Sequence, residues 1–299
     1  MQLNYEFLKT RIGDPVRQSY GCRETILYNL GVGANVIESP ASADLSLVWE
    51  RRLQALPTMA TVLGEEPYWF DDARTGLDWR RSVHGEHHME WRAPLPAEGE
   101  VIGQSAVEEV YDKGAGRGAL LVTRRTLSDA ASGRTIAVIR KGVFFRGQGG
   151  FGGPTAPAAV SPPQHAPELT VSLGTRPEQA LLYRLSGDNF PLHVDPAFAT
   201  EAGFTGPILH GLCTYAIAAR AVIAGVCDGE AARLRTFGAR FSAPVFPGET
   251  IETLIWLLGP GAAAVQCRVG ERTVIDNARV EFDAAAADRA VGRPGGTPS

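Results

Sequence analysis

An aspartate and a histidine close together in the second half of the chain are the most promising reactive pair. Asp188 and His193 lie five positions apart, Gly187 permits a tight turn before them, and Pro191 prevents a regular helix between them. Near pH 7 such a pair offers a carboxylate and a mostly neutral imidazole, which can take a proton from water and return one to carbon. The alternative is a structural turn in which Asp188 caps backbone N–H groups and His193 is half-buried. Composition alone favours that alternative.

A glycine downstream could supply a hydrogen-bond donor. Gly206 and Pro207 precede a long apolar stretch that begins at Gly211 and ends at Gly225, which predicts a buried helix. The backbone N–H of Gly211 would point out of the N-terminus of this helix. A donor there suits a carbonyl oxygen that gains negative charge, and the helix dipole adds to the effect. A glycine that only lets the chain enter the helix would look the same in the sequence.

A histidine-rich segment in the first half contains possible metal ligands. Residues 84–88 are His-Gly-Glu-His-His, but no cysteine or further histidine lies near them in sequence. Alternating apolar residues follow and indicate a strand, on which the neighbouring His87 and His88 point to opposite faces. We therefore expect no metal ion here. Lys113, one of only three lysines in the chain, is by default a solvated loop residue.

The second half contains the elements that must position the reactive pair. A short helical segment is expected over residues 177–185, before the buried helix. Strands are then predicted at residues 237–243, 265–269 and 278–282, where apolar and polar residues alternate. One buried helix followed only by strands indicates an antiparallel sheet wrapped on a helix, in the α+β class.

The two halves of the chain look like distant copies of each other. Residues 23–31 match residues 178–186 at an offset of 155, and residues 91–95 match residues 241–245 at an offset of 150. At the first offset, Asp188 and His193 correspond to Gly33 and Glu38. The first half therefore lacks the reactive pair, which predicts one active site per chain. The first half is then free to widen and hold part of a substrate.

A segment rich in glycine and proline, residues 146–172, separates the two halves and predicts a linker. A phosphate-binding loop is the alternative, but such a loop leads from a strand into a helix, and prolines follow here instead. From about residue 284 the chain is rich in alanine, glycine and proline without periodicity. We expect residues 288–299 to form a disordered tail.

Composition excludes several classes of protein. The 299 residues are 44% hydrophobic, which excludes a disordered chain of low hydrophobicity. With 33 acidic and 29 basic residues the net charge is −4, so no bulk positive field is available to hold a nucleic acid. The four cysteines are far apart, which argues against a disulfide framework or a zinc finger. Without a signal peptide or an apolar span, we expect a cytoplasmic protein and no membrane partner.

Two segments carry a family resemblance. Residues 183–199, Y-R-L-S-G-D-N-F-P-L-H-V-D-P-A-F-A, and residues 206–215, G-P-I-L-H-G-L-C-T-Y, resemble the signature of the MaoC-like, R-specific enoyl-CoA hydratases (hydratase 2). The resemblance extends to shorter motifs in both halves, at residues 84–85, 112–114, 146–153, 239–241 and 247–250. That family has a double hot-dog fold, two copies of a helix wrapped by an antiparallel sheet. The resemblance implies an N-terminal hot-dog domain over residues 1–145 and a catalytic one over residues 173–287.

The resemblance also implies a reaction and a set of site residues. The expected reaction is the reversible hydration of a trans-2-enoyl-CoA to a (3R)-3-hydroxyacyl-CoA, with no metal ion or other cofactor. Asp188 and His193 would be the catalytic dyad, and the Gly211 N–H would polarise the thioester carbonyl. The partner is a CoA thioester, and the family suggests a homodimer. The expected substrate-binding residues are His84, Gly85, Lys113, Asn189, Leu192 and Phe241.

One position departs from the family pattern. The family has an asparagine two residues after the catalytic aspartate, where this chain has Phe190, and an asparagine stands one place earlier as Asn189. We expect a remodelled turn in which Phe190 packs into the core and Asn189 supplies the amide. Two other functions remain open. One is a thioesterase or dehydratase that acts on an unusual acyl-CoA, and the other is an acyl-CoA-binding protein that has lost activity.

Overall fold

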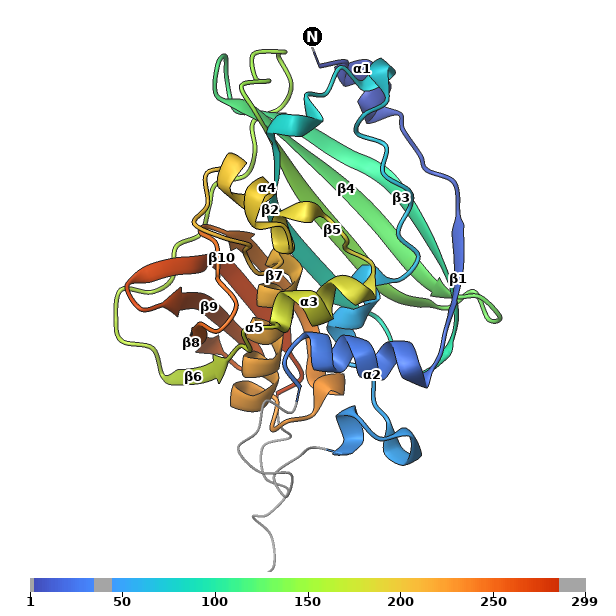
Figure 1. Ribbon diagram of the computed structural model, residues 1–299, viewed down its shortest axis with the longest axis vertical. Coiled ribbons are helices and arrows are strands. Elements are labelled where there is room, and N and C mark those ends of the chain that lie inside the picture. The colour runs from blue at the N-terminus through green and yellow to red at the C-terminus, as the bar shows by residue number, and fades with distance from the viewer. Residues whose placement is uncertain (1–2, 35–44, 285–299) are drawn as a thin grey trace, which may run out of the picture.

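The computed structural model describes residues 3–34 and 45–284 of the chain. Most regular elements are strands, and a few helices cover one face of them (Figure 1). The first half consists of α1 (Tyr5–Lys9), β1 (Val16–Tyr20), α2 (Cys22–Gly31), β2 (Ser82–Trp91), β3 (Gly99–Asp112), β4 (Gly118–Asp129) and β5 (Thr135–Arg146). The second half consists of β6 (Leu169–Gly174), α3 (Gln179–Tyr183), α4 (Pro196–Glu201), α5 (Gly211–Val226), β7 (Leu234–Phe241), β8 (Thr250–Gly259), β9 (Ala262–Val269) and β10 (Arg272–Phe282).

The strands form one ten-stranded antiparallel sheet in the order β1-β3-β4-β5-β2-β7-β10-β9-β8-β6. From its outer edge inward, the first half runs β1-β3-β4-β5-β2 and the second runs β6-β8-β9-β10-β7. The two orders are the same, which confirms the internal repeat. The halves join where β2 pairs with β7, near the centre of the sheet (Figure 1).

Helix α5 is the buried helix that the apolar stretch predicts. It spans Gly211–Val226, one residue longer than expected, and ten of its residues are buried. Because it has almost no polar face, it packs against strands of the second half on several sides. The side chain of Tyr215 extends from α5 to the sheet and donates a hydrogen bond of 2.7 Å to the Phe237 carbonyl. The second half therefore has the expected arrangement of a sheet wrapped on a helix.

Equivalent short helices of the two halves meet near the middle of the molecule. Tyr28 of α2 and Tyr183 of α3 are 155 residues apart, and their buried rings lie 6.1 Å from each other. The buried Gln179 side chain donates hydrogen bonds of 3.0 and 2.6 Å to the carbonyls of Leu30 and Gly31 at the end of α2. Two copies that associate about a local twofold axis would show this pairing.

The first half differs from the expected pattern, because its wrapped helix is very short. Among the described residues of the first half, the helix against the inner face of β2 is the six-residue 3₁₀ helix η4 (Pro57–Val62). There the indole of Trp91 donates a hydrogen bond of 2.9 Å to the Pro57 carbonyl, and the Thr61 hydroxyl lies 3.1 Å from Nε2 of His87. After η4 the chain continues toward β2 through two short 3₁₀ turns. No long helix of the described chain packs residues 63–78 in place; buried side chains such as Phe70 and Leu77 pack against the sheet, and polar contacts add to them.

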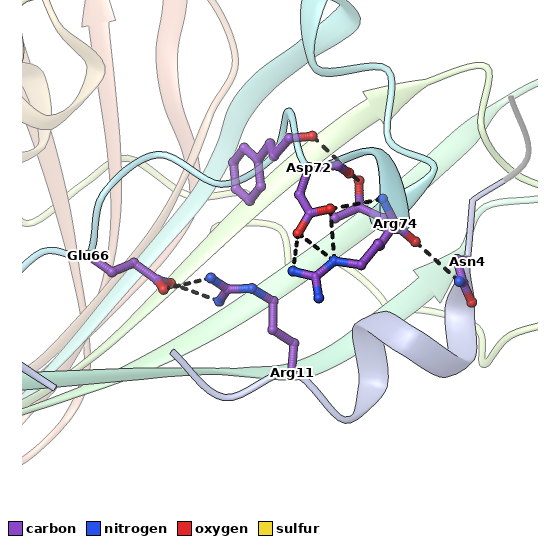
Figure 2. Close-up of polar contacts among 7 residues, drawn as sticks. Asn4, Arg11, Glu66, Asp72 and Arg74 are labelled. Carbon is purple, nitrogen blue, oxygen red and sulfur yellow. Dashed lines mark hydrogen bonds and ion pairs between the residues drawn. The ribbon is translucent and has the colours of Figure 1, made fainter. Parts of the chain in front are cut away.

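Polar contacts fix this segment to the N-terminus of the chain (Figure 2). The guanidinium of Arg11 donates two hydrogen bonds, of 3.2 and 2.9 Å, to the Glu66 carboxylate. Asp72 accepts hydrogen bonds from the backbone and side chain of Arg74, and the Asn4 amide donates to the Arg74 carbonyl at 3.1 Å. Together these contacts hold the segment across β3 and β4.

The segment between the halves carries no helix or strand from residue 147 to residue 168. Its start is anchored by Asp112 at the end of β3, whose carboxylate accepts hydrogen bonds from the N–H groups of Gly114, Gly150 and Gly152. These bonds lower the pKa of Asp112.

The expected tail, residues 288–299, lies outside the described residues. All four cysteines are free, and no helix of the described chain is long and apolar enough to span a bilayer.

A close crossing of two glycines gives a test of this packing. A side-chain carbon added at Gly103 of β3 would lie only 2.0 Å from the Gly64 carbonyl oxygen, just after η4. We expect Gly103→Ala to lower the free energy of unfolding by about 2 kcal/mol or more, because backbone must move to relieve the clash. Denaturant unfolding measures the change. Gly206→Ala is the control, since a carbon added there meets nothing within 4 Å, and an equal loss in both variants would contradict the prediction.

Candidate active site

The loop between α3 and α4 brings Asp188 and His193 together. The final residue of the 3₁₀ turn η8 (Pro191–His193) is His193, and possible ligand atoms of Asp188, His193 and His210 all lie within 4.8 Å of one another. Gly187 has a φ of 124°, which an L side chain rarely adopts, so the tight turn before Asp188 needs a glycine. The Phe190 N–H donates a hydrogen bond of 3.2 Å to one carboxylate oxygen of Asp188. The other oxygen remains available to a ligand.

The hydrogen bonding of His193 determines which of its nitrogens can act as a base. Nδ1 lies 2.8 Å from the carbonyl oxygen of Ile208, which can only accept, so Nδ1 carries the proton of the neutral ring. Nε2 is then an unprotonated acceptor. Burial lowers the pKa of His193, while the Ile208 carbonyl and the Asp188 charge oppose that shift. The neutral ring is therefore the dominant form at pH 7.

His210 lies directly behind this pair, and the sequence analysis did not select it. Its ring stacks on that of His193 with centroids 3.7 Å apart and planes 24° apart. Nε2 donates a hydrogen bond of 3.1 Å to the backbone carbonyl of Asp188, which holds the loop in place. Burial and the neighbouring His193 lower the pKa of His210 to about 4. The sequence signal that could have indicated His210 is its position just before Gly211, within the motif at residues 206–215.

The same three residues are a possible metal-binding group by composition and proximity. Their geometry does not favour a metal ion. The two imidazole rings lie nearly parallel, so their in-plane lone pairs run side by side rather than converging on one point. One ring nitrogen on each histidine is also engaged with a backbone carbonyl. The arrangement is better suited to a water molecule, which would donate its two protons to two acceptors at this site.

Gly211 is the first residue of α5, as predicted. Its N–H has no hydrogen-bond partner among the described residues, as is usual at the start of a helix. The ring of Phe241, at the end of β7, covers this point, and a carbon added at Gly211 would lie 3.5 Å from it. The N-terminus of a long helix thus presents a donor beside an apolar ring.

A β-bulge at Gly85 explains how the first half reaches the site. The register of β2 against β5 shifts between His84 and Glu86, so His84 lies on the same face as His87 instead of the opposite one. The ring of His84 lies 5.4 Å from that of His87 and 5.0 Å from that of Phe241, both edge-on. The structure therefore brings His84 against Phe241, whose ring covers Gly211. Burial holds the pKa of His84 well below its usual value.

The neighbouring histidines of β2 point to opposite faces, as predicted. His87 is 2% exposed, its Nε2 lies 3.1 Å from the Thr61 hydroxyl, and its ring contacts Tyr215 edge-on. His88 lies on the other face, beside Gly238 of β7. Burial lowers the pKa of His87 to about 3, so this histidine is neutral.

Of the other expected site residues, Lys113 is remote from the dyad, while Leu192 and Asn189 lie next to it in the chain. Lys113 follows the end of β3, three strands away from β2 in the sheet, and its backbone N–H donates to the Gly118 carbonyl. Leu192 lies half-buried in η8, where its carbonyl accepts from the Ile208 N–H at 3.3 Å. Asn189 is exposed, and its side chain makes no hydrogen bond to the described residues. The dyad and Lys113 are therefore not in one cluster.

The expectation that Phe190 packs into the core is wrong. Its side chain is 47% exposed and makes an edge contact with Phe198 of α4, with ring centroids 5.4 Å apart. The turn is short, and its backbone is committed to capping Asp188 and forming η8. With φ and ψ of −60° and 131° before Pro191, Phe190 is held in extended backbone and its ring lies over α4.

Comparison with known proteins agrees with this geometry. Residues 156–279 match the MaoC like domain, and residues 18–147 match the MFE-2 hydratase 2 N-terminal domain. The chain is 40% identical to the 3-hydroxyacyl-thioester dehydratase Y of Mycobacterium tuberculosis, over 91% of this chain and 96% of that protein. This chain belongs to the MaoC-like hydratase 2 family. It is also 36% identical to the peroxisomal enoyl-CoA hydratase 2 of Arabidopsis thaliana, over 86% of this chain and 88% of the relative.

Solved structures show the same architecture. A MaoC-like dehydratase from Phytophthora capsici superposes with a TM-score of 0.83 at 31% identity, over 96% of this chain and all of that one. A Mycobacterium tuberculosis protein described as a double hotdog fold superposes with a TM-score of 0.56 at 12% identity, over 93% of this chain and 98% of that one. The expected double hot-dog fold is therefore confirmed.

Two buried neutral histidines make stability depend on pH. The pKa is about 3 for His87 and about 4 for His210, against 6.5 for an unperturbed histidine. Below pH 6.5 the unfolded chain binds protons that the folded chain does not, so the folded state loses stability as the pH falls. We expect a loss of about 1.4 kcal/mol per pH unit for each histidine between pH 6.5 and 4. Denaturant unfolding at several pH values measures this slope.

The contribution of one histidine can be separated from the rest. His87→Gln removes its titration and keeps an acceptor for Thr61, so the dependence on pH should become shallower. His165→Gln is the control, because His165 is exposed. An unchanged slope in His87→Gln would show that this ring is not buried in its neutral form.

Proposed function

We propose that the protein hydrates trans-2-enoyl-CoA thioesters reversibly to (3R)-3-hydroxyacyl-CoA, as part of fatty-acid or related acyl-CoA metabolism. The observation that carries the proposal is the convergence of Asp188 and His193, a histidine whose Nε2 is unprotonated, beside the N-terminus of α5. The names of the two relatives support it from both directions, since one is a hydratase and the other a dehydratase. These are the two directions of one reaction.

The dyad is suited to hold and activate one water molecule. Because the two O–H bonds of water are about 105° apart, a water that donates to two acceptors at about 2.8–3.0 Å each spans roughly 4.4–4.8 Å, and a carboxylate oxygen of Asp188 and a ring nitrogen of His193 lie within 4.8 Å of each other. Held in this way, its oxygen lone pair is free to attack C3. His193 Nε2 takes the proton that leaves the water, and the Asp188 carboxylate stabilises the imidazolium that forms. That imidazolium then returns a proton to C2, so the hydroxyl and the proton both come from water.

The Gly211 N–H supplies the complementary donor. As C3 is attacked, negative charge moves onto the thioester oxygen, and a donor at the helix N-terminus stabilises that charge. The Phe241 ring covers this point, and the His84 ring lies edge-on against Phe241. Removing one such donor typically lowers the rate by about 10²–10³-fold. The chain supplies every group in this scheme without a cofactor.

Substrate binding and assembly complete the proposal. Five of the expected residues would contact the CoA thioester: Lys113, His84, Gly85, Leu192 and Phe241. Asn189 is the least favourably placed of the expected residues. The proposed assembly is a homodimer in the cytoplasm. The leucines Leu181 and Leu185 on the surface beside the catalytic loop, 50% and 56% exposed, support a contact with a second copy.

The dyad variants test this function directly. We expect wild-type protein to bleach the ultraviolet absorbance of the conjugated enoyl thioester without releasing free thiol, because hydration removes the double bond and thioester cleavage would release CoA. Asp188→Asn and His193→Gln nearly keep the shape of each side chain and remove proton transfer. Each should lower kcat by at least about 10³-fold with little change in unfolding temperature.

His88→Gln is the matched control, because His88 lies on the opposite face of β2 and should keep full activity. His87 is not a suitable control, since it is buried beside the site. Near-normal turnover in either dyad variant would overturn the assignment. Thiol release without bleaching would identify a thioesterase, and binding without either change would identify a protein that only binds acyl-CoA.

Lys113→Ala tests the proposed contact with CoA. Lys113 lies three strands from β2, which at about 4.8 Å per strand places it roughly 14 Å away, a distance that fits the extended CoA group better than the reacting carbons. We expect KM to rise more than kcat falls, because the contact is equally strong before and during reaction. The effect should shrink in added salt. A loss confined to kcat and insensitive to salt would remove Lys113 from this role.

A further inference from the structure

A group of polar side chains on the inner face of the first half lies beside the catalytic loop. We call it the inner polar cluster; it consists of Thr61, Glu65, His87, Arg125 and Lys141. Lys141 of β5 is the direct partner of His87 in the sheet register, so both side chains lie on the same face. In a hot-dog half with a long wrapped helix this face would be apolar. Here the short η4 covers only part of it.

Lys141 occupies an unusual position for a lysine. About a third of its side chain is accessible to solvent, yet protein surrounds the ammonium closely enough that desolvation lowers the pKa of Lys141. The register opposite His87 places this side chain on the inner face of the sheet rather than on the outer surface. The charge of Lys141 acts on His84 and His87 and attracts the Asp188 carboxylate. Lys141 is also close to the site by geometry, because it pairs with His87 and the His87 ring lies 5.4 Å from that of His84.

The ammonium has spare hydrogen-bonding capacity. Among the described residues its one ion pair is with Glu65, at a long 3.6 Å, and Glu65 is also bound by the guanidinium of Arg125. Lys141 and Asp188 attract each other but form no direct ion pair in the described chain. An ammonium has three donors, so at least two point toward space that substrate or water must fill.

The balance of charges around Lys141 limits which substrate groups can bind beside it. Arg125 is paired with Glu65, and Glu66 is paired with Arg11, while Asp188 balances Lys141. The pKa values of both nearby histidines are lowered, so these rings are neutral. A further carboxylate would add an uncompensated negative charge beside Asp188, at a high cost in free energy. A neutral oxygen acceptor would accept a hydrogen bond from Lys141 without that cost.

We propose that Lys141 is a specificity-determining residue that donates a hydrogen bond to a neutral oxygen, a hydroxyl or a ketone, on the acyl chain of the substrate. This inference rests on the proposed hydration of enoyl-CoA. With the thioester oxygen at Gly211 and C3 at the dyad, an acyl chain that continues toward the first half would meet the inner face of β2 and β5, where His84, His87 and Lys141 lie. The preferred substrate is then an oxygenated enoyl-CoA rather than a plain fatty acyl one.

The test compares matched substrates. The kcat/KM is measured for trans-2-octenoyl-CoA and for the same chain with one hydroxyl or keto group at successive carbons beyond C4, and with a terminal carboxylate. We expect wild-type protein to prefer at least one hydroxyl or keto substrate over the plain chain by about tenfold or more, as a hydrogen bond to a charged group provides. The carboxylate substrate should rank below it.

The variant Lys141→Met keeps the stem of the side chain and removes its charge and donors. It should abolish the preference by lowering kcat/KM for the oxygenated substrate far more than for the plain one. Arg140→Met is the matched control, because Arg140 is the adjacent residue, lies on the opposite face and is bound to Glu108 at 2.7 Å. Its substrate preference should equal that of the wild type.

The outcomes separate this inference from the proposed function. If wild-type protein hydrates the plain chain but shows no preference for any oxygenated one, the inference fails and the function stands; this holds even if Lys141→Met does not fold. If Lys141→Met lowers kcat/KM equally for all substrates, the inference also fails, since Lys141 would then serve the dyad. A preference for the carboxylate would overturn the charge argument. No hydration of any substrate would refute the proposed function itself.

Discussion

The pairing of β2 with β7 is the constraint on which the active site depends. It joins the two half-sheets through a continuous hydrogen-bonded ladder, and Glu86 and Arg240, opposite each other in register, bind across it at 2.8–3.0 Å. Because β2 contains the bulge at Gly85 and β7 ends in Phe241, this pairing determines where the His84 ring meets the Phe241 ring that covers the start of α5. If the register of β2 against β7 shifted by one residue, His87 would point outward and a different side chain would take its place on the inner face.

Much of the catalytic half could be predicted from sequence because its signals are local. The apolar stretch after Gly211 has no polar face, so its burial as a helix follows from composition, and α5 begins at the predicted residue. The kink that brings Asp188 to His193 depends on Gly187 and Pro191, whose backbone preferences are known from their chemistry. The internal repeat was also predicted from short local matches, and the strand order, which is the same in both halves, confirms it.

Features that depend on long-range contacts could not be predicted in the same way. The short η4 in place of a wrapped helix, and the position of Phe190 on the surface, follow from how distant segments pack. His210 was visible as a neighbour of Gly211, but its stacking on His193 required the fold. Lys141 had a local signal that was not used. It interrupts an inward-facing row of Ala137, Ile139 and Val143 on β5. A lysine in such a row is unfavourable for the free energy of folding, which suggests that it has a function.

The duplicated architecture has a consequence for how this active site can change. In a dimer of identical hot-dog subunits every substitution appears twice, so a charge that helps one subunit bind substrate is imposed on the other subunit's catalytic machinery as well. Here both copies are in one polypeptide, and residues 147–168 connect them. The copy without a dyad can therefore accumulate polar residues such as Lys141 without altering the copy that has one. Fusion into one chain releases the two halves from symmetry and lets selectivity and catalysis evolve separately.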